Sequence, residues 1–138
     1  AGVYSVMAAH NEINGVPCHM NKYLMNNILR KELNFKGFIV SDWMDVERIH
    51  SLHNVAEDFK QACLFSVDAG LDMNMHGPYF LEEVLKLINE NKISESRIDK
   101  SIRKILLAKF KLGLFENPLI DVSKVKDRIF TETIKKHP

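Results

Sequence analysis

Residues 36–43 read Lys-Gly-Phe-Ile-Val-Ser-Asp-Trp, and this stretch decides the fold. Gly37 precedes a fully apolar run, Phe38–Val40, which ends abruptly on polar Ser41 and Asp42. A short run that is apolar on both faces is typical of a strand in a parallel sheet that helices cover. A helical pattern follows, marked by Phe59, Ala62, Cys63 and Ser66, and it ends at Gly70. The stretch therefore predicts a strand, a loop and a helix in that order.

The same order of elements occurs on both sides of this unit. Before it, residues 3–9 predict a short strand, residues 11–17 are rich in turn formers, and Asn21 can cap a helix. The apolar face of that helix consists of Leu24, Met25, Ile28 and Leu29. After it, residues 71–75 predict a third strand, and the helix that follows has an apolar face of Phe80, Leu81, Val84, Leu87 and Ile88.

A last helix is predicted from a capping box of Ser96 and Asp99, with Gly113 as its stop. Apolar strands that alternate with helices predict an α/β fold in which the strands are parallel. The three strands should lie side by side in sequence order, with their helices on one outer face. Three strands leave both edges of a sheet open, so the pattern predicts a piece of a larger domain.

Composition and charge exclude several classes of function. The chain has 138 residues, of which 46% are hydrophobic and 27% are charged, which is the balance of a globular protein. A net charge of +1 gives no surface for a polyanion, so neither nucleic acid nor an anionic membrane is an expected partner. No apolar run approaches the roughly 20 residues of a membrane span. Cys18 and Cys63 form neither a disulfide framework nor metal-ligand spacing.

Polar residues follow the predicted strands at the end where catalytic groups gather in parallel α/β folds. Asp42 is the strongest candidate for a functional residue, because a carboxylate after a fully apolar strand is costly to desolvate unless it has a partner or faces an open pocket. Trp43 follows it directly, and an aromatic ring beside a carboxylate is the pairing that a sugar site needs. On spacing alone, an aspartate before a helix is more often a helix cap.

Three segments together resemble the family 3 glycoside hydrolases, a group that includes β-glucosidases and β-xylosidases. They are N-E-I-N-G-V-P at residues 11–17, K-G-F-I-V-S-D-W at residues 36–43 and A-G-L-D-M at residues 69–73. Residues 93–118, ISESRIDKSIRKILLAKFKLGLFENP, resemble the closing helix and exit of the catalytic barrel in that family. The resemblance covers residues 5 to about 118.

The resemblance implies an α/β fragment of a (β/α)8 TIM barrel, comprising about its last three strand-helix units. Residues 1–117 would be the C-terminal portion of the barrel, and residues 118–138 its exit and an interdomain linker. The implied partners are a carbohydrate substrate, the remaining barrel strands and a second domain, which in this family usually supplies the acid/base carboxylate. Export to the periplasm or the cell exterior is implied by the resemblance alone.

The resemblance also implies the chemistry. Asp42 falls on the catalytic nucleophile of a retaining β-glycosidase, which hydrolyses terminal β-linked sugars, most plausibly β-glucosides, through a glycosyl-enzyme intermediate. Trp43 falls on the wall of the sugar subsite. His10 lies where many members carry tyrosine near the nucleophile, and an imidazole there can hydrogen-bond the carboxylate with a charge that varies near neutral pH. Apart from the resemblance, Met75 and His76 follow the third predicted strand and are expected at the pocket rim, and Met75 joins the predicted substrate-binding residues. Neither a metal nor another cofactor is expected.

Other polar residues are weaker candidates. We expect solvated loop carboxylates at Glu12, Asp45 and Glu47, surface side chains at His50, His53 and His137, and a solvated basic helix face at Lys100, Arg103, Lys104, Lys109 and Lys111. Asp72 should anchor the barrel top by hydrogen bonds. Two alternatives stay open: a β-xylosidase or arabinosidase of the same family, and a catalytically silent module that binds carbohydrate or serves assembly.

Overall fold

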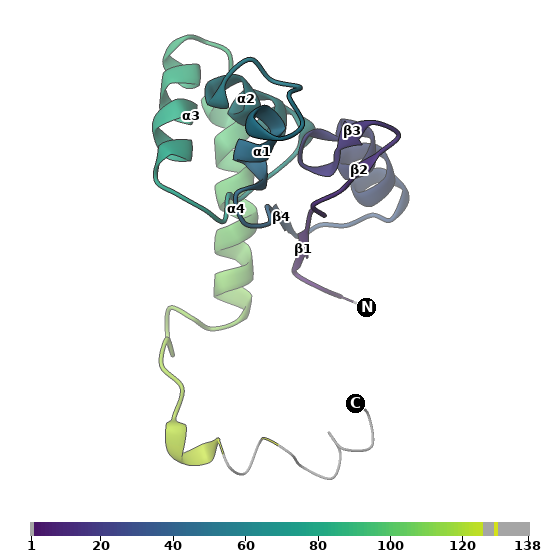
Figure 1. Ribbon diagram of the computed structural model, residues 1–138. Helices are drawn as coiled ribbons and strands as arrows, with labels where there is room; N and C mark the ends of the chain where they lie inside the picture. Colours follow the sequence, from purple (N-terminus) through teal and green to yellow (C-terminus); the bar gives the residue numbers. More distant parts are fainter. Residues whose placement is uncertain (1, 126–128, 130–138) are drawn as a thin grey trace. The chain divides into compact units, whose positions relative to one another are not determined.

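A computed structural model describes residues 2–125 and 129 of the chain. The chain divides into two units, Ala1–Ala108 and Lys109–Pro138. The first unit contains all the strands of the described residues, together with the 3-10 helix η1 (Cys18–Met20), the π-helix η2 (Tyr23–Glu32) and the α-helices α1 (Asp45–Ser51), α2 (Phe59–Ala69) and α3 (Tyr79–Asn89). Helix α4 spans Glu95–Lys111, and the second unit also holds the 3-10 turn η3 (Val122–Lys124) (Figure 1).

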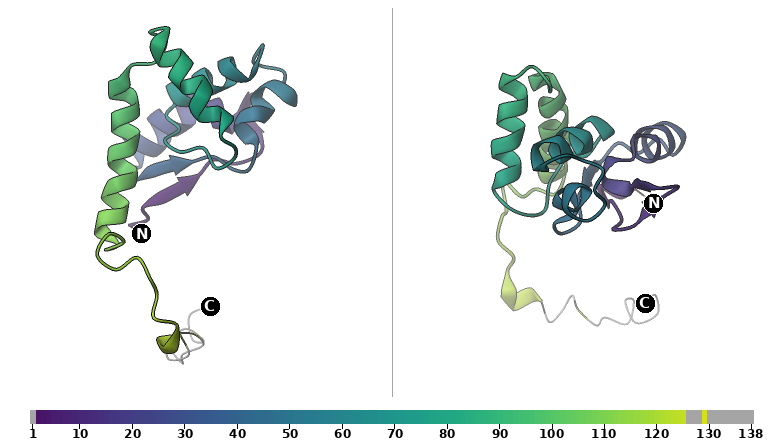
Figure 2. Two further views of the ribbon diagram at one scale, coloured as in Figure 1. Left: turned by 90° about the vertical axis from the view of Figure 1, so that its left-hand side faces the viewer. Right: turned by 45° about the horizontal axis from the view of Figure 1, so that its top comes forward.

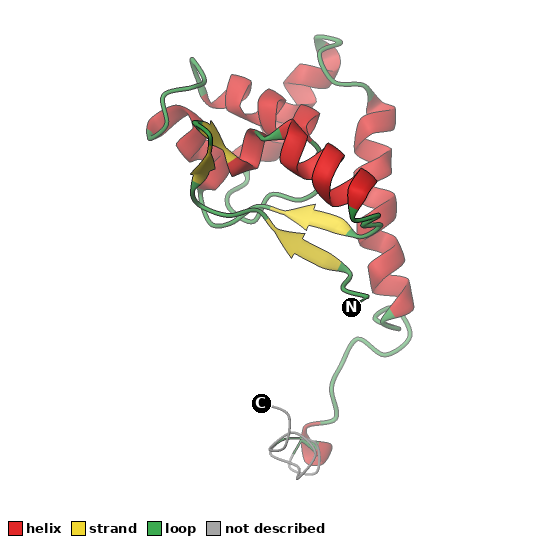
Figure 3. Ribbon diagram, turned by 90° about the vertical axis from the view of Figure 1, so that its right-hand side faces the viewer, coloured by secondary structure: helices red, strands yellow, loops and turns green. Residues whose placement is uncertain are grey.

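Parallel strands form the centre of the first unit. Strand β1 (Ser5–Met7) pairs with β4 (Phe38–Val40), with Ser5 opposite Phe38 and Met7 opposite Val40 (Figure 3). On the other side of β4, Val40 forms a parallel bridge to Met73, and the Ser41 N–H donates to the Met73 carbonyl at 2.8 Å. The predicted order and direction of the three segments are therefore confirmed. The predicted third strand is reduced to this single bridge.

Gly37 is required by the close approach of β1 and β4. A Cβ atom at this position would lie 2.2 Å from the Tyr4 carbonyl oxygen and 2.6 Å from the Phe35 ring. The neighbouring Phe38 N–H donates to the same Tyr4 oxygen at 3.1 Å. Any side chain at residue 37 would therefore push apart the two strands whose ends carry the polar residues.

The turn-rich segment after β1 is a hairpin rather than a plain loop. Strand β2 (Glu12–Ile13) pairs antiparallel with β3 (Val16–Pro17). Asn14 and Gly15 connect them with φ angles of 52° and 76°, which is the backbone of a type I′ turn. The Asn-Gly pair, flanked by the β-branched residues Ile13 and Val16, is the signal for this hairpin in the sequence.

Helix η2 begins after Asn21, as predicted, and the Asn21 Oδ1 accepts from the Leu24 N–H at 2.9 Å. Gly70 ends α2 with a φ of 115°, and Gly113 follows α4 with a φ of 67°, so both predicted helix stops are confirmed. Helix α4 begins at Glu95, however, so Ser96 lies inside the first turn and not at a capping position.

Helix α1 lies in a segment for which the sequence predicts a loop. Met44 precedes it in the left-handed conformation, with a φ of 60°, and turns the chain directly into the helix. Val46 and Ile49 are both fully buried and lie three residues apart, so they form one apolar face. The acidic residues Asp45 and Glu47 lie in the first turn, where the helix dipole favours negative charge.

Helix α2 packs between α1 and α3, and its apolar face contributes to the main core (Figure 2). This core joins strand β4 to the helices and consists of Met25, Ile39, Val46, Cys63, Val67, Ala69, Leu71, Val84, Leu87 and Ile93. Cys63 is fully buried there, as predicted, and its burial raises the pKa of the thiol to about 12. Within the described part of the chain, no helix is both long and apolar enough to cross a bilayer.

Asp72 anchors the third strand segment through a fully buried carboxylate. Its Oδ2 accepts from the Ile39 N–H at 2.9 Å and pairs with the Arg30 guanidinium at 2.5 Å. Its Oδ1 accepts from the Ser101 hydroxyl at 2.7 Å and from the Lys104 ammonium at 2.8 Å. One carboxylate thus ties together β4, η2 and α4.

Two predictions are corrected by this cluster. Asp72 is an anchor, but it faces η2 and α4 and not the strand ends where Asp42 lies. Lys104 is not on a solvated face, because its ammonium group reaches inward to Asp72, and burial lowers its pKa. A carboxylate on an apolar strand has to find cations, and these came from helices about 30 or more residues away in the sequence.

Replacing Asp72 by asparagine should destabilise the protein by about 3–5 kcal/mol, because it leaves three partly buried cations without their counter-ion: Arg30, Lys104 and Arg97, whose Nη1 lies 3.8 Å from the Asp72 Oδ1. The free energy of unfolding in urea measures this change. The matched control is Asp68→Asn, which breaks an exposed pair with Lys22 and should cost at most about 1 kcal/mol. Equal costs for the two variants would contradict the role assigned to Asp72.

Candidate active site

Asp42 lies at the C-terminal end of β4, immediately after the buried Ser41. The Asp42 main-chain N–H donates to the His19 Nε2 at 2.9 Å, and its Oδ1 accepts from the Trp43 N–H at 2.6 Å. Its side chain is 27% exposed. The carboxylate is therefore held in place from the main-chain side while part of it stays open to solvent.

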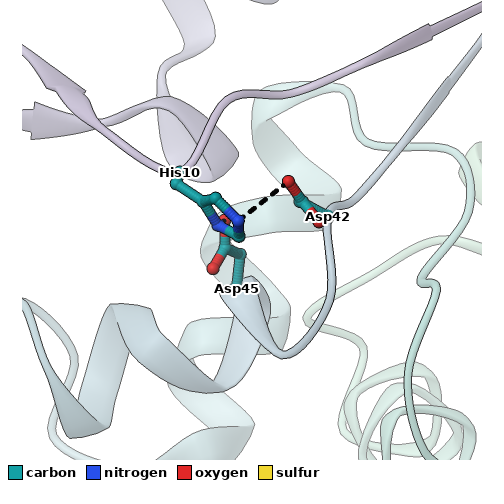
Figure 4. A group of neighbouring side chains, drawn as sticks. All are labelled: His10, Asp42 and Asp45. Carbon is teal, nitrogen blue, oxygen red and sulfur yellow. Dashed lines mark hydrogen bonds and ion pairs between the residues drawn. The ribbon is translucent and has the colours of Figure 1, made fainter.

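His10 reaches Asp42 from the neighbouring strand. The parallel register of β1 and β4 brings the ends of both strands to the same edge, and residue 10 follows β1. The His10 Nε2 lies 3.1 Å from the Asp42 Oδ2, and the His10 Nδ1 lies 2.6 Å from the Asp45 Oδ2. Figure 4 shows the imidazole ring between the two carboxylates. The structure thus brings together two of the predicted site residues.

Asp45 was expected to be a solvated loop carboxylate, and this expectation is wrong. It is the first residue of α1, and its side chain is only 3% exposed. Its Oδ1 accepts from the Arg48 Nη1 at 2.7 Å, while its Oδ2 faces His10. Glu47 is also on α1 and contacts the His76 Nδ1 at 3.0 Å, whereas Glu12 is exposed as predicted.

His19 is the residue that the sequence analysis missed. It lies in η1, is buried, and accepts the Asp42 N–H through its Nε2. The other nitrogen, Nδ1, must then carry the proton, and it lies 3.4 Å from the Asp45 Oδ2. Burial lowers the pKa of His19, and the nearby carboxylates of Asp45 and Asp42 oppose this shift only in part. No pattern in the sequence distinguished His19, because its role depends on folding of the preceding hairpin.

The predicted substrate-binding residues Trp43 and Met75 lie at the strand ends. The Trp43 side chain is about half exposed, and its ring packs against His76 with centroids 4.3 Å apart. The Met75 N–H donates to the Ser41 hydroxyl at 2.8 Å, which fixes the segment after the third strand beside β4. Trp43 therefore presents an aromatic surface next to the Asp42 carboxylate.

Three side chains offer donor atoms within 4.8 Å of one another, which is close enough to share a metal ion: His10, Asp42 and Asp45. The Arg48 guanidinium, however, already lies against Asp45 and brings a positive charge to the same place. Each His10 nitrogen also faces a carboxylate oxygen at hydrogen-bond distance. The geometry favours a network of ion pairs over a metal site.

The remaining histidines differ from the prediction. His50 is partly buried, and its Nδ1 lies 3.0 Å from the Ala56 carbonyl oxygen. The His53 side chain is 16% exposed and lies 3.9 Å from Glu12. His50 is held by the loop that follows α1, and His53 lies in that loop; helix α1 itself was not predicted. His137 lies outside the described residues.

The arrangement is suited to nucleophilic chemistry by Asp42. A carboxylate that is partly open, fixed by main-chain hydrogen bonds and paired with an imidazole can attack an electrophilic carbon without first moving. The exposed ring of Trp43 beside it can stack on the apolar face of a sugar.

The chain matches a family model described as "Glycosyl hydrolase family 3 N terminal domain" over residues 1–108. It is 43% identical to a β-xylosidase of Formosa agariphila, with 98% of this chain and 19% of that protein covered. It is 34% identical to a periplasmic β-glucosidase of Salmonella typhimurium, over 86% of this chain and 15% of that protein.

Solved structures give the same result. A crystal structure of a β-glucosidase from Listeria innocua in complex with glucose superimposes with a TM-score of 0.86 and 38% identity, over 96% of this chain and 18% of that one. The chain thus spans less than a fifth of the length of each of these relatives.

Replacing His19 by leucine should reduce the free energy of unfolding by about 1–3 kcal/mol at pH 7.5, because the buried Asp42 N–H loses its hydrogen-bond acceptor. The difference in unfolding free energy between the wild type and the variant should narrow as the pH falls below the ordinary histidine pKa of about 6.5. Below this pH, His19 takes up a proton in the unfolded wild type, whereas burial disfavours its protonation in the folded state. Acid therefore lowers the unfolding free energy of the wild type through His19, and the variant has no such group to titrate. Urea unfolding from pH 7.5 to 5 measures it, and a difference that stays constant would contradict a neutral His19.

Proposed function

This chain belongs to glycosyl hydrolase family 3, and from that membership we propose that it carries the nucleophile of a retaining β-glycosidase. The nucleophile is Asp42. The observation that supports this assignment most strongly is its position: it is a partly open carboxylate at the end of β4, held by the His19 ring and paired with His10.

In the proposed reaction, the Asp42 carboxylate attacks the anomeric carbon of a terminal β-linked sugar. The glycosidic bond breaks, the leaving oxygen takes a proton from an acid, and a glycosyl-enzyme ester forms. Water, deprotonated by the same group acting as a base, then hydrolyses the ester and regenerates the carboxylate. Trp43 stacks on the bound sugar, and Met75 lies at the rim. No metal or other cofactor takes part in this proposal.

The acid/base group of this reaction belongs to a part of the enzyme outside this chain. Asp45 is the carboxylate nearest in sequence to Asp42, but its oxygens face Arg48 and His10 and its side chain is almost fully buried. It cannot reach a leaving group. We therefore assign the acid/base to a second domain, in keeping with the small share of the relatives that this chain covers.

We further propose that residues 1–117 are the C-terminal portion of a (β/α)8 barrel and that residues 118–138 lead out of it. The parallel order of β1, β4 and the Met73 segment fits consecutive strands of such a barrel. The solvent-exposed Met7 side chain on β1 would then be covered by the remaining strands.

β-Glucosides are the proposed substrates, because the relatives include β-glucosidases from several organisms and a structure in complex with glucose. β-Xylosides are the second candidate, supported by the 43% identity to the Formosa agariphila β-xylosidase. The rates of one full-length enzyme on the aryl β-glucoside and the aryl β-xyloside decide between them. Export to the periplasm or the cell exterior is proposed from the periplasmic relative.

Replacing Asp42 by alanine in the full-length enzyme should lower turnover of an aryl β-glycoside by several orders of magnitude, because the covalent step is lost. The control is Glu12→Gln, which removes an exposed carboxylate on the nearby hairpin and should leave turnover close to that of the wild type. Turnover by Asp42→Ala within tenfold of the wild type would remove Asp42 from the mechanism. A full-length wild type without turnover on any aryl glycoside would favour a silent module.

The 138-residue chain by itself should hydrolyse no aryl β-glycoside. A retaining enzyme needs a second carboxyl group about 5–5.5 Å from the nucleophile as its acid/base. Asp45 lies within 4.8 Å of Asp42, but its carboxylate is buried against Arg48 and His10 and cannot reach a leaving group. The open edge of β1 and its exposed side chains should also make the isolated chain associate. An assay of fractions from size-exclusion chromatography tests both expectations. Clear hydrolysis by a monomer would mean that a carboxylate within this chain is the acid/base.

A further inference from the structure

His10 faces a carboxylate through each of its two ring nitrogens. The Nδ1 is 2.6 Å from the Asp45 Oδ2, and the Nε2 is 3.1 Å from the Asp42 Oδ2 (Figure 4). A neutral imidazole carries one N–H and therefore satisfies only one of these contacts as a hydrogen bond. The positively charged imidazolium carries two, so it is the form in which both contacts are hydrogen bonds.

Of the charged groups around the ring, two carboxylates attract an imidazolium and one guanidinium repels it. The groups that face His10 are Asp42 from the end of β4 and both Asp45 and Arg48 from α1; the Arg48 Nη1 lies 3.3 Å from the His10 Nδ1. His19, beyond Asp45, is neutral because burial lowers its pKa. The net charge of the two carboxylates and the guanidinium is −1, and a protonated His10 brings the net charge of the group to zero. Glu12, on the hairpin after His10, is exposed and lies near His53.

We propose that His10 is a positioning residue that acts as an imidazolium bridge between Asp45 and Asp42 and thereby makes the nucleophile depend on pH. This inference rests on the proposed function of Asp42. It assigns His10 to holding the nucleophile and not to contacting the sugar.

The two ends of the bridge are not equivalent. Asp45 is buried, its other oxygen is bound by Arg48, and its contact with His10 is the shorter one. Asp42 is 27% exposed and can exchange its partner for water. When His10 loses a proton, the Nδ1–H therefore stays on Asp45 and the Nε2–H is lost. The Nε2 lone pair then faces the Asp42 Oδ2, so the attacking carboxylate loses both its hydrogen bond and its positive neighbour.

The consequence is that activity falls at alkaline pH because of the change at the nucleophile, and not because the acid/base is deprotonated. An activated substrate, 2,4-dinitrophenyl β-glucoside, separates the two, because its leaving group needs little protonation. With the full-length enzyme, kcat/KM for this substrate should still fall as the pH rises. In His10→Gln, an amide that can donate a hydrogen bond to Asp42 but cannot titrate, the alkaline fall should disappear.

The same variant should reduce kcat/KM at neutral pH by about ten- to hundredfold, the effect of weakening one hydrogen bond to a charged group. The matched control is His50→Gln, a histidine at the far end of α1 that contacts the Ala56 carbonyl, and it should keep the wild-type profile. An alkaline fall that is unchanged in His10→Gln would overturn the proposal while leaving Asp42 as the nucleophile.

A second measurement needs no turnover. Diethyl pyrocarbonate modifies neutral imidazoles, and His10 is accessible to it because its side chain is 57% exposed. At pH 7, Asp42→Asn should raise the rate of His10 modification several-fold, measured by peptide mass spectrometry, with the His50 rate as the internal reference. An unchanged His10 rate would overturn the bridge. A raised rate in Asp42→Asn, together with a full-length wild type that hydrolyses no aryl glycoside, would support the bridge and reject the proposed function.

Discussion

The buried carboxylate of Asp72 is the constraint on which the rest of the structure depends. It has no exposed surface, yet it lies in a segment that pairs with β4, so it must be compensated by cations from elsewhere in the chain. Arg30 comes from η2 and Lys104 from α4, and the Ile39 N–H comes from β4 itself. Because these partners lie on three different elements, satisfying one charge fixes the positions of all three.

Fixing the strands also assembles the candidate site. The three parallel segments end at one edge, and each contributes side chains to the candidate site there: His10 after β1, Asp42 after β4, and Met75 and His76 after the third segment. Electrostatics then set the details. Asp45 and Arg48 on α1 hold one side of the His10 ring, and Asp42 receives the other. The site is therefore a consequence of strand order together with one short helix.

Much of this could be predicted from the sequence, because apolar runs and helix stops are local signals. The β4 strand, the ends of α2 and α4 and the parallel order all follow from residues close together in the chain. The part that could not be predicted depends on distant partners. Asp45 and Lys104 look like solvated charges until folding places His10 and Asp72 beside them, and His19 has no local signature. Helix α1 was missed although Val46 and Ile49 gave its spacing.

The central claim is that Asp42 forms a covalent bond to the sugar. The most direct test is to incubate the full-length enzyme with a 2-deoxy-2-fluoro β-glucoside that carries a good leaving group, because the fluorine slows hydrolysis of the intermediate more than an activated leaving group slows its formation. Digestion and mass spectrometry then locate the labelled residue. The account predicts one fluoroglucosyl group on the peptide that contains residues 36–43, attached to Asp42. A label on any other carboxylate would contradict it.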